Sequence, residues 1–172
     1  MKNTDTREKI LGLLFRYPLR VFHLREMSRL ILVSSPSVAR YIGDLEREGL
    51  IVMGRKKFLH EISANLDNDR FRELKRVNNI KSVYDSGLLA YLKEIFPLST
   101  IVLFGSYSKG DDTERSDIDI AIFTNGKKLD LDKYEKKLDR PINVEFIDFE
   151  KISKELKNSL INGLVLEGYI EV

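Results

Sequence analysis

The segment from residue 101 to residue 122 constrains the fold of this 172-residue chain more than any other part of it. It begins with Ile-Val-Leu-Phe at residues 101–104, an apolar run of strand length, as expected for a strand that is covered on both faces. A glycine turn and a polar loop lead to Asp117-Ile-Asp119-Ile-Ala-Ile122. Alternation along a strand places the two aspartates on one face and the isoleucines on the other. We therefore expect two strands joined by a turn, with two carboxylates on one face.

The turn and the carboxylates together indicate a site for a phosphate and a metal ion. Gly105 can turn tightly and bring backbone N–H groups close to an anion, the Ser106 hydroxyl can bond a phosphate oxygen, and Lys109 adds positive charge. Two neighbouring carboxylates repel each other unless a cation lies between them, and carboxylate oxygens favour Mg²⁺ or Mn²⁺. The alternative is an ordinary turn beside a sheet edge that carries two solvated aspartates.

A third acidic residue follows on a later predicted strand at residues 141–148, after a short charged helix that begins near Asp130. Alternation places Glu145 on the face opposite Ile142, Val144 and Phe146. A third carboxylate beside the first two would complete a two-metal site. Asp148 is the alternative ligand, but it lies at the end of the strand, and alternation places it on the opposite face from Glu145. The pattern therefore favours Glu145.

The motifs Gly105-Ser-Tyr-Ser-Lys-Gly110 and Ser116-Asp-Ile-Asp-Ile120 resemble the minimal nucleotidyltransferase domain of the DNA polymerase β superfamily. The resemblance covers roughly residues 85–172 and implies transfer of a nucleoside monophosphate from an NTP, with ATP as the expected donor. It implies that Gly105 and Ser106 hold the β- and γ-phosphates, that Asp117 and Asp119 bind the nucleotide-associated Mg²⁺, and that Asp119 and Glu145 flank a second ion. The family commonly has aspartate at the third acidic position and arginine where Lys109 stands.

The first 63 residues have the pattern of three helices followed by two short strands. Thr6 can cap a helix that ends at Tyr17-Pro18, and a second helix spans about residues 23–30. Serine followed by Pro36 starts a third helix, for which Gly49 is a plausible stop. Two strands over residues 50–63 then enclose the basic connection Gly54-Arg55-Lys56-Lys57.

This order of elements resembles the winged helix-turn-helix fold of bacterial and archaeal transcription regulators. The resemblance implies that the third helix enters the major groove of DNA and that the hairpin touches phosphates. The candidate contacts to bases or backbone are Ser35, Ser37, Arg40 and Tyr41, and the candidate phosphate contacts are Arg55, Lys56 and Lys57. A solvated hairpin tip and a protein-docking role for the module are the alternatives.

These features predict an α+β protein with a winged helix-turn-helix domain at residues 1–64, a connecting helix at residues 65–82 and a small α/β nucleotidyltransferase domain with a mixed sheet at residues 83–172. Residues 1–65 hold 12 Lys and Arg against 7 Asp and Glu, whereas residues 66–172 hold 17 against 20. The net positive charge of residues 1–65 fits an anionic partner, and the net negative charge of residues 66–172 fits a site for cations. The sequence leaves open whether the connecting helix packs against either domain or against its copy in a homodimer.

The composition excludes several other chemistries. With no cysteine, disulfides and zinc-thiolate sites are excluded, and His23 and His60 have no metal-ligand neighbour at useful spacing. The chain shows no signal-peptide core and no apolar run of membrane-spanning length, so we expect a cytoplasmic protein without a membrane partner. The two family resemblances imply an NTP and DNA as partners and, as the acceptor, a helical toxin-like protein. The rival hypothesis is a non-catalytic DNA-binding regulator that only binds a nucleotide or a partner.

Overall fold

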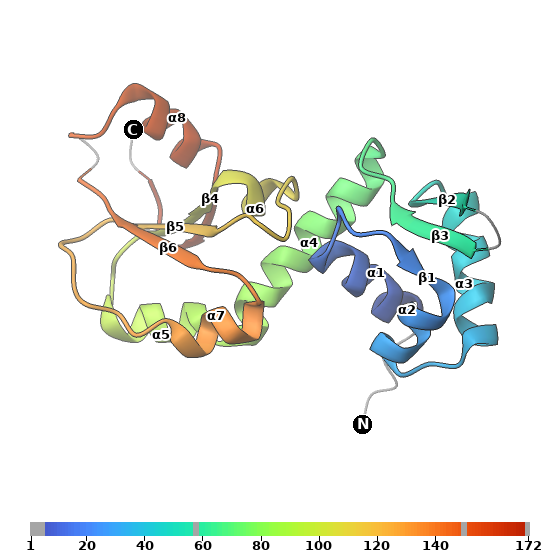
Figure 1. Cartoon of the computed structure of the whole chain (residues 1–172). Helices are drawn as coiled ribbons and strands as arrows, with labels where there is room; N and C mark the ends of the chain where they lie inside the picture. Colours follow the sequence, from blue (N-terminus) through green and yellow to red (C-terminus); the bar gives the residue numbers. More distant parts are fainter. Residues whose placement is uncertain (1–5, 57–58, 149–150, 171–172) are drawn as a thin grey trace. The chain divides into compact units, whose positions relative to one another are not determined.

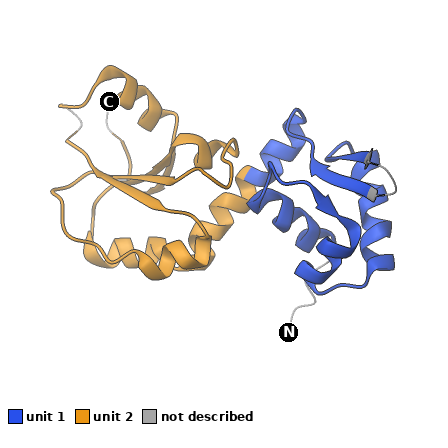
Figure 2. Cartoon of the chain, in the orientation of Figure 1, with its two compact units in different colours: residues 1–75 blue, residues 76–172 orange. Residues whose placement is uncertain are grey.

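The computed structural model describes residues 6–56, 59–148 and 151–170 and divides the chain into two compact units. Unit 1 comprises residues 1–75 and unit 2 comprises residues 76–172 (Figure 2). The division falls inside helix α4 (Asp69–Ser86), within the segment that was expected to connect two domains. No helix among the described residues is long and apolar enough to span a membrane.

Unit 1 contains the three helices and the hairpin that the sequence predicts. Its elements are α1 (Thr6–Arg16), β1 (Phe22–His23), α2 (Leu24–Ile31), α3 (Ser35–Arg47), β2 (Ile51–Lys56) and β3 (Leu59–Ala64). The strands form an antiparallel sheet in the order β1-β3-β2. Pro36 lies in the first turn of α3, and Gly49 follows its end with a φ of 73°, a conformation that glycine adopts without strain.

The core of unit 1 comes from one face of each helix and from the sheet. Ile10 of α1, Met27 of α2 and Val38 of α3 are fully buried. Leu45 of α3, about two helical turns after Val38, is buried on the same face of the helix. Phe71, at the start of α4, packs on Phe15 with 5.1 Å between the ring centroids. Unit 1 therefore has a hydrophobic core of its own, as an independent domain requires.

The helical segment that enters unit 2 breaks later than the sequence suggested. Within and after the connecting segment, the apolar stripes of the sequence predict one helix over about residues 66–79 and another over about residues 83–95. The structure instead has α4 running to Ser86 and α5 spanning Leu88–Ile95. Val83 of α4 packs in the core of unit 2, and this packing stabilises the helix beyond residue 79. The break between α4 and α5 lies at Gly87, which has a φ of 83°.

Unit 2 is built on a mixed four-stranded sheet, as predicted. Its elements are β4 (Ile101–Phe104), α6 (Gly105–Lys109), β5 (Ile118–Ile122), α7 (Asp132–Leu138), β6 (Ile142–Phe146), α8 (Lys154–Ile161) and β7 (Leu164–Glu167). The strand order is β6-β5-β4-β7, with β4 antiparallel to both neighbours and β5 parallel to β6. Helices α5 and α7 cover one face of the sheet, and α8 lies on the other (Figure 1).

The two faces of the sheet have separate cores. Ile101 and Leu103 of β4 pack with Ile120 of β5 on the α5 and α7 face. Val102 and Phe104 pack with Leu160 of α8 on the other face. Strand β4 is therefore covered on both faces, which confirms the prediction made from its unbroken apolar run.

The end of the chain differs from the expectation. The apolar pattern predicts one or two helices over residues 149–167 and a short strand over residues 168–172, of which residues 171–172 lie outside the described residues. In the structure α8 ends at Ile161, and β7 occupies residues 164–167. A Cβ at Gly163 would lie 2.9 Å from the carbonyl oxygen of Leu103. The glycine thus lets the chain pass close to β4 and turn into a strand paired with it, a long-range contact that the local pattern does not contain.

Candidate active site on the sheet of unit 2

The turn at Gly105 forms the centre of the candidate site. Gly105 directly follows β4, has a φ of 71° and begins the short helix α6. A Cβ at this position would collide with Oδ2 of Asp119 and would lie 3.2 Å from its Cγ. Glycine is therefore required both by the backbone conformation and by the carboxylate that approaches it. The structure brings together two of the residues that the motif predicts to share a site.

Replacing Gly105 by alanine is expected to distort this contact. The left-handed conformation costs a non-glycine residue about 1–2 kcal/mol, and the new methyl group would push the Asp119 carboxylate away. We expect Mg²⁺-dependent ATP affinity, measured by calorimetry, to fall by about tenfold or more. Gly12→Ala is the control, because a Cβ there meets no atom within 4 Å, and it should leave ATP affinity unchanged.

The two predicted metal-binding aspartates lie where strand alternation places them. Asp119 is half-buried within β5, and Asp117 is exposed immediately before that strand. Their neighbours Ile118 and Ile120 are fully buried on the opposite face. In the sheet Asp119 is paired with Phe104 of β4 on one side and with Asn143 of β6 on the other. The carboxylate of Asp119 is thus held between the glycine turn and β6.

The residue of β6 beside Asp119 is an asparagine. Nδ2 of Asn143 donates a hydrogen bond to Oδ1 of Asp119 over 3.2 Å. Glu145, the predicted third carboxylate, is half-buried and pairs with Ala121, one step further along the same face. The described part of the chain contains no group of three His, Cys, Asp or Glu side chains that could hold a metal ion. The role of Glu145 stays a prediction, and the alternative ligand Asp148 forms an ion pair with Lys151 at 2.5 Å.

The other predicted phosphate ligands belong to α6. Ser106 is half-buried at the second position of the helix, and Lys109 is exposed at its end. The Ser108 hydroxyl donates to the carbonyl oxygen of Gly105 over 2.9 Å, and Gly110 closes the helix with a φ of 81°. This short helix was not expected, since the sequence indicated only a turn. It fixes the spacing between Ser106 and Lys109.

The sequence did not predict a buried polar cluster that contacts α6. Asn79 of α4 donates from Nδ2 to the carbonyl oxygen of Tyr107 over 3.0 Å and to Oδ1 of Asp112 over 2.6 Å. The other carboxylate oxygen of Asp112 lies 4.0 Å from the guanidinium of Arg140, just before β6. Asn79, Asp112 and Arg140 are all buried, so their polar groups need such partners. We refer to these three residues as the Asp112 cluster.

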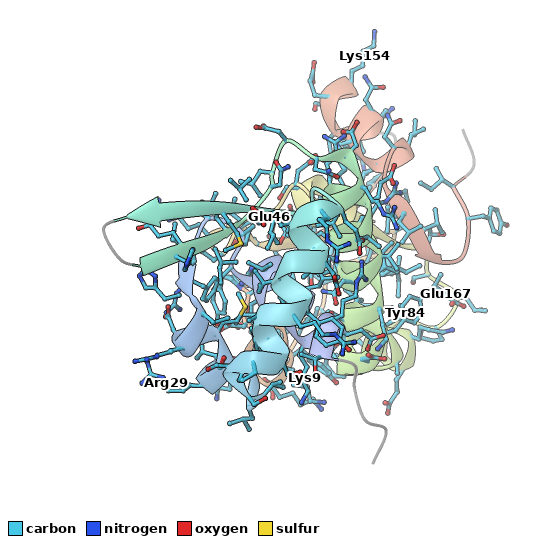
Figure 3. All side chains as sticks on the ribbon, turned by 90° about the vertical axis from the view of Figure 1, so that its right-hand side faces the viewer. Lys9, Arg29, Glu46, Tyr84, Lys154 and Glu167 are labelled. Carbon is cyan, nitrogen blue, oxygen red and sulfur yellow. The ribbon has the colours of Figure 1, made fainter. Side chains whose placement is uncertain are left out.

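Unit 1 carries a pocket at the amino end of α3. Its volume is about 570 Å³, and it is lined by Arg25, Ser28 and Arg29 of α2 and by Val33, Ser34 and Ser35. Arg25 and Arg29 are exposed, and Arg29 extends outward from the ribbon in Figure 3. Among the predicted DNA contacts whose side chains the structure describes, only Ser35 lines the pocket. The signal that could have identified the two arginines is their spacing of four residues on the outer side of a predicted helix.

The remaining predicted DNA contacts lie on α3 and on the hairpin. Ser37 and Tyr41 are half-buried on α3, and the exposed Arg40 places its guanidinium carbon 5.2 Å from the centre of the Tyr41 ring. Arg55 and Lys56 belong to β2, and Lys57 lies outside the described residues. The helix and the hairpin therefore stand in the expected order, while their function as a DNA-binding surface stays a prediction.

Comparison with known proteins bears on unit 2. The family model described as "Nucleotidyltransferase domain" matches residues 86–166, which include the Gly105 turn, both aspartates and β6. These residues therefore carry a nucleotidyltransferase domain, and no family match confirms the winged helix-turn-helix assignment of unit 1. The chain matched none of the curated proteins and none of the solved structures with which it was compared.

Proposed function

We propose that unit 2 transfers a nucleoside monophosphate from an NTP, with ATP as the donor, to a hydroxyl group of a partner protein. The observation that carries the proposal is the contact between the Asp119 carboxylate and the Gly105 turn, within a segment that matches the nucleotidyltransferase domain. It places a candidate metal ligand next to a candidate phosphate-binding turn. Helices α5, α7 and α8 all pack on the sheet, so none of them is available to form a separate binding site for a small acceptor. We therefore propose that a partner protein presents the hydroxyl group.

The proposed roles follow from the position of each residue. Gly105 and Ser106 would hold the phosphates, Lys109 would add positive charge, and Asp117 and Asp119 would hold the Mg²⁺ that accompanies the nucleotide. When bound, Mg²⁺ supplies the charge that stabilises the triphosphate and the leaving pyrophosphate. Glu145, on the same face as Asp119, would accept the proton of the attacking hydroxyl.

The experiment that tests the proposal follows two labels. ATP labelled at the α-phosphate and ATP labelled at the γ-phosphate are incubated separately with the protein, Mg²⁺ and an extract of the source cells, with EDTA as the control. Transfer of the α label alone, abolished by EDTA, is the expected result. Mg²⁺-dependent ATP binding without label transfer would support the non-catalytic regulator instead, and absence of such binding would refute both.

A second function, DNA binding by unit 1, is proposed from the pocket between α2 and α3. Two arginines of α2 and three serines line it, and two of these serines, Ser34 and Ser35, lie at the amino end of α3, where backbone N–H groups and the helix dipole favour an anion. A DNA phosphate carries the negative charge that this position favours. The arginines would then add phosphate contacts to those proposed for Arg55, Lys56 and Lys57, while Ser37, Arg40 and Tyr41 would face the groove.

The pair of substitutions Arg25→Ala and Arg29→Ala is expected to weaken DNA binding at every sequence tested. Each lost phosphate contact lowers the slope of log K against log salt by about 1, so the double variant should lose about 2. Gel shift at several salt concentrations measures this slope. The matched control is Arg70→Ala with Arg72→Ala, which removes the same charge from α4. An unchanged slope in the first variant would contradict the assignment of the pocket.

A further inference from the structure

Asn143 occupies the place on β6 that a third metal-binding carboxylate would need. The parallel pairing sets it directly beside Asp119, with the two side chains on one face of the sheet. Its amide group donates to Oδ1 of Asp119 over 3.2 Å. An amide N–H occupies this carboxylate oxygen as a hydrogen-bond donor, whereas a metal ligand must offer an oxygen lone pair. The pairing therefore puts a neutral residue where the second ion would be held.

Glu145 lies one step further along the same face of β6 than Asn143. It is paired with Ala121, two residues beyond Asp119, which corresponds to about 6.6 Å along the strand axis. Asp117, Asp119 and Glu145 are all among the described residues, which contain no group of three acidic side chains that could hold a metal ion. Ala121, the partner of Glu145, belongs to the apolar cluster that α8 covers with Leu160. Glu145 thus stands at the border of this cluster rather than at the glycine turn.

The difference in charge between the neutral Asn143 and a carboxylate at the same position decides how many divalent ions the site can hold. Asp117 and Asp119 supply two negative charges for the ion that accompanies the nucleotide. A second ion beside Asp119 would find the neutral Asn143 in place of a third carboxylate, and ligand charge sets the affinity of oxygen sites for divalent cations. The hydrogen bond from Asn143 also stabilises Asp119 when no cation is bound.

We infer that Asn143 takes the β6 position beside Asp119 that a third metal-binding carboxylate would need, and that the chain therefore binds one divalent ion with its nucleotide and lacks a stable site for a second. The inference rests on the proposed function, because it concerns the same nucleotide site. It makes Asn143 the residue that sets the metal stoichiometry, and it assigns Glu145 to proton transfer alone.

The test counts bound Mn²⁺ by electron paramagnetic resonance in the presence of a non-hydrolysable ATP analogue. The wild-type protein and Glu145→Gln should each bind one Mn²⁺ per chain. Asn143→Asp should bind two, with the affinity for the second ion raised about tenfold or more. The matched control is Asn158→Asp, which adds the same charge at an exposed position of α8 and should still bind one ion.

The outcomes separate the inference from the function on which it rests. Two Mn²⁺ ions in the wild-type protein, reduced to one by Glu145→Gln, would overturn the inference and restore Glu145 as the third ligand. This comparison does not depend on whether Asn143→Asp folds, which circular dichroism checks. A single ion in a folded Asn143→Asp protein would also overturn it. No Mn²⁺ bound with the nucleotide in any variant would refute the proposed function itself.

Discussion

Asp119→Asn is expected to lower the rate of nucleotidyl transfer by about 10²- to 10³-fold. The carboxylate lies against the Gly105 turn and accepts a hydrogen bond from Asn143 of β6, so it stands next to the proposed phosphate-binding turn. A bound Mg²⁺ contributes several kcal/mol to the stabilisation of transition-state charge, and about 3–4 kcal/mol corresponds to this change in rate. The initial rate of α-label transfer from ATP measures the effect.

The substitution is suited to this test because asparagine conserves the shape of the side chain. Its amide oxygen can still accept the hydrogen bond from Asn143, so we expect the melting temperature to change little. Asp130→Asn is the control, since it removes the same charge from an exposed loop of unit 2 and should leave the rate unchanged. A folded Asp119→Asn protein that transfers the label at the wild-type rate would contradict the proposed role.

Local patterns predicted the parts of the fold that local physics determines. The serine, proline and glycine signals around α3 mark its two ends because caps and stops act within a few residues. The alternation of Asp117 and Asp119 with buried isoleucines places both carboxylates on one face, since a strand has a fixed period of two. Helix α4 ends at Ser86, before Gly87, rather than near residue 80, because an apolar stripe does not mark the residue at which a helix ends.

The site depends on contacts that no local pattern contains. Alternation predicts the face of Glu145 correctly, but only the pairing of β5 with β6 shows that Asn143 is the residue beside Asp119. A shift of two residues along a strand keeps the face and changes the neighbour, so the sequence could not distinguish the two positions. Similarly, Asp111 and Asp112 both look like loop residues, yet the structure exposes the first and buries the second.

The Asp112 cluster is expected to be the most sensitive part of unit 2 to substitution. Asp112→Ala removes the carboxylate that accepts from Asn79 and faces Arg140, and the guanidinium of Arg140 stays buried. Removing one partner of a buried ion pair costs about 3–5 kcal/mol, a large fraction of the stability of a domain this size. Urea denaturation measures the free energy of unfolding. Asp85→Ala, which removes an exposed carboxylate paired with Lys81, should cost about 0.5 kcal/mol or less.

The effect should also reach the nucleotide site, because Asn79 holds the carbonyl oxygen of Tyr107 within α6. Asp112→Asn keeps an oxygen that can accept from Asn79, so it should retain more stability and ATP affinity than Asp112→Ala. If the contribution of Asp112 is its interaction with Arg140, adding Arg140→Leu to Asp112→Ala should recover part of the lost stability, since the buried charge is then gone. Strictly additive losses in the double variant would show instead that the two residues stabilise unit 2 independently.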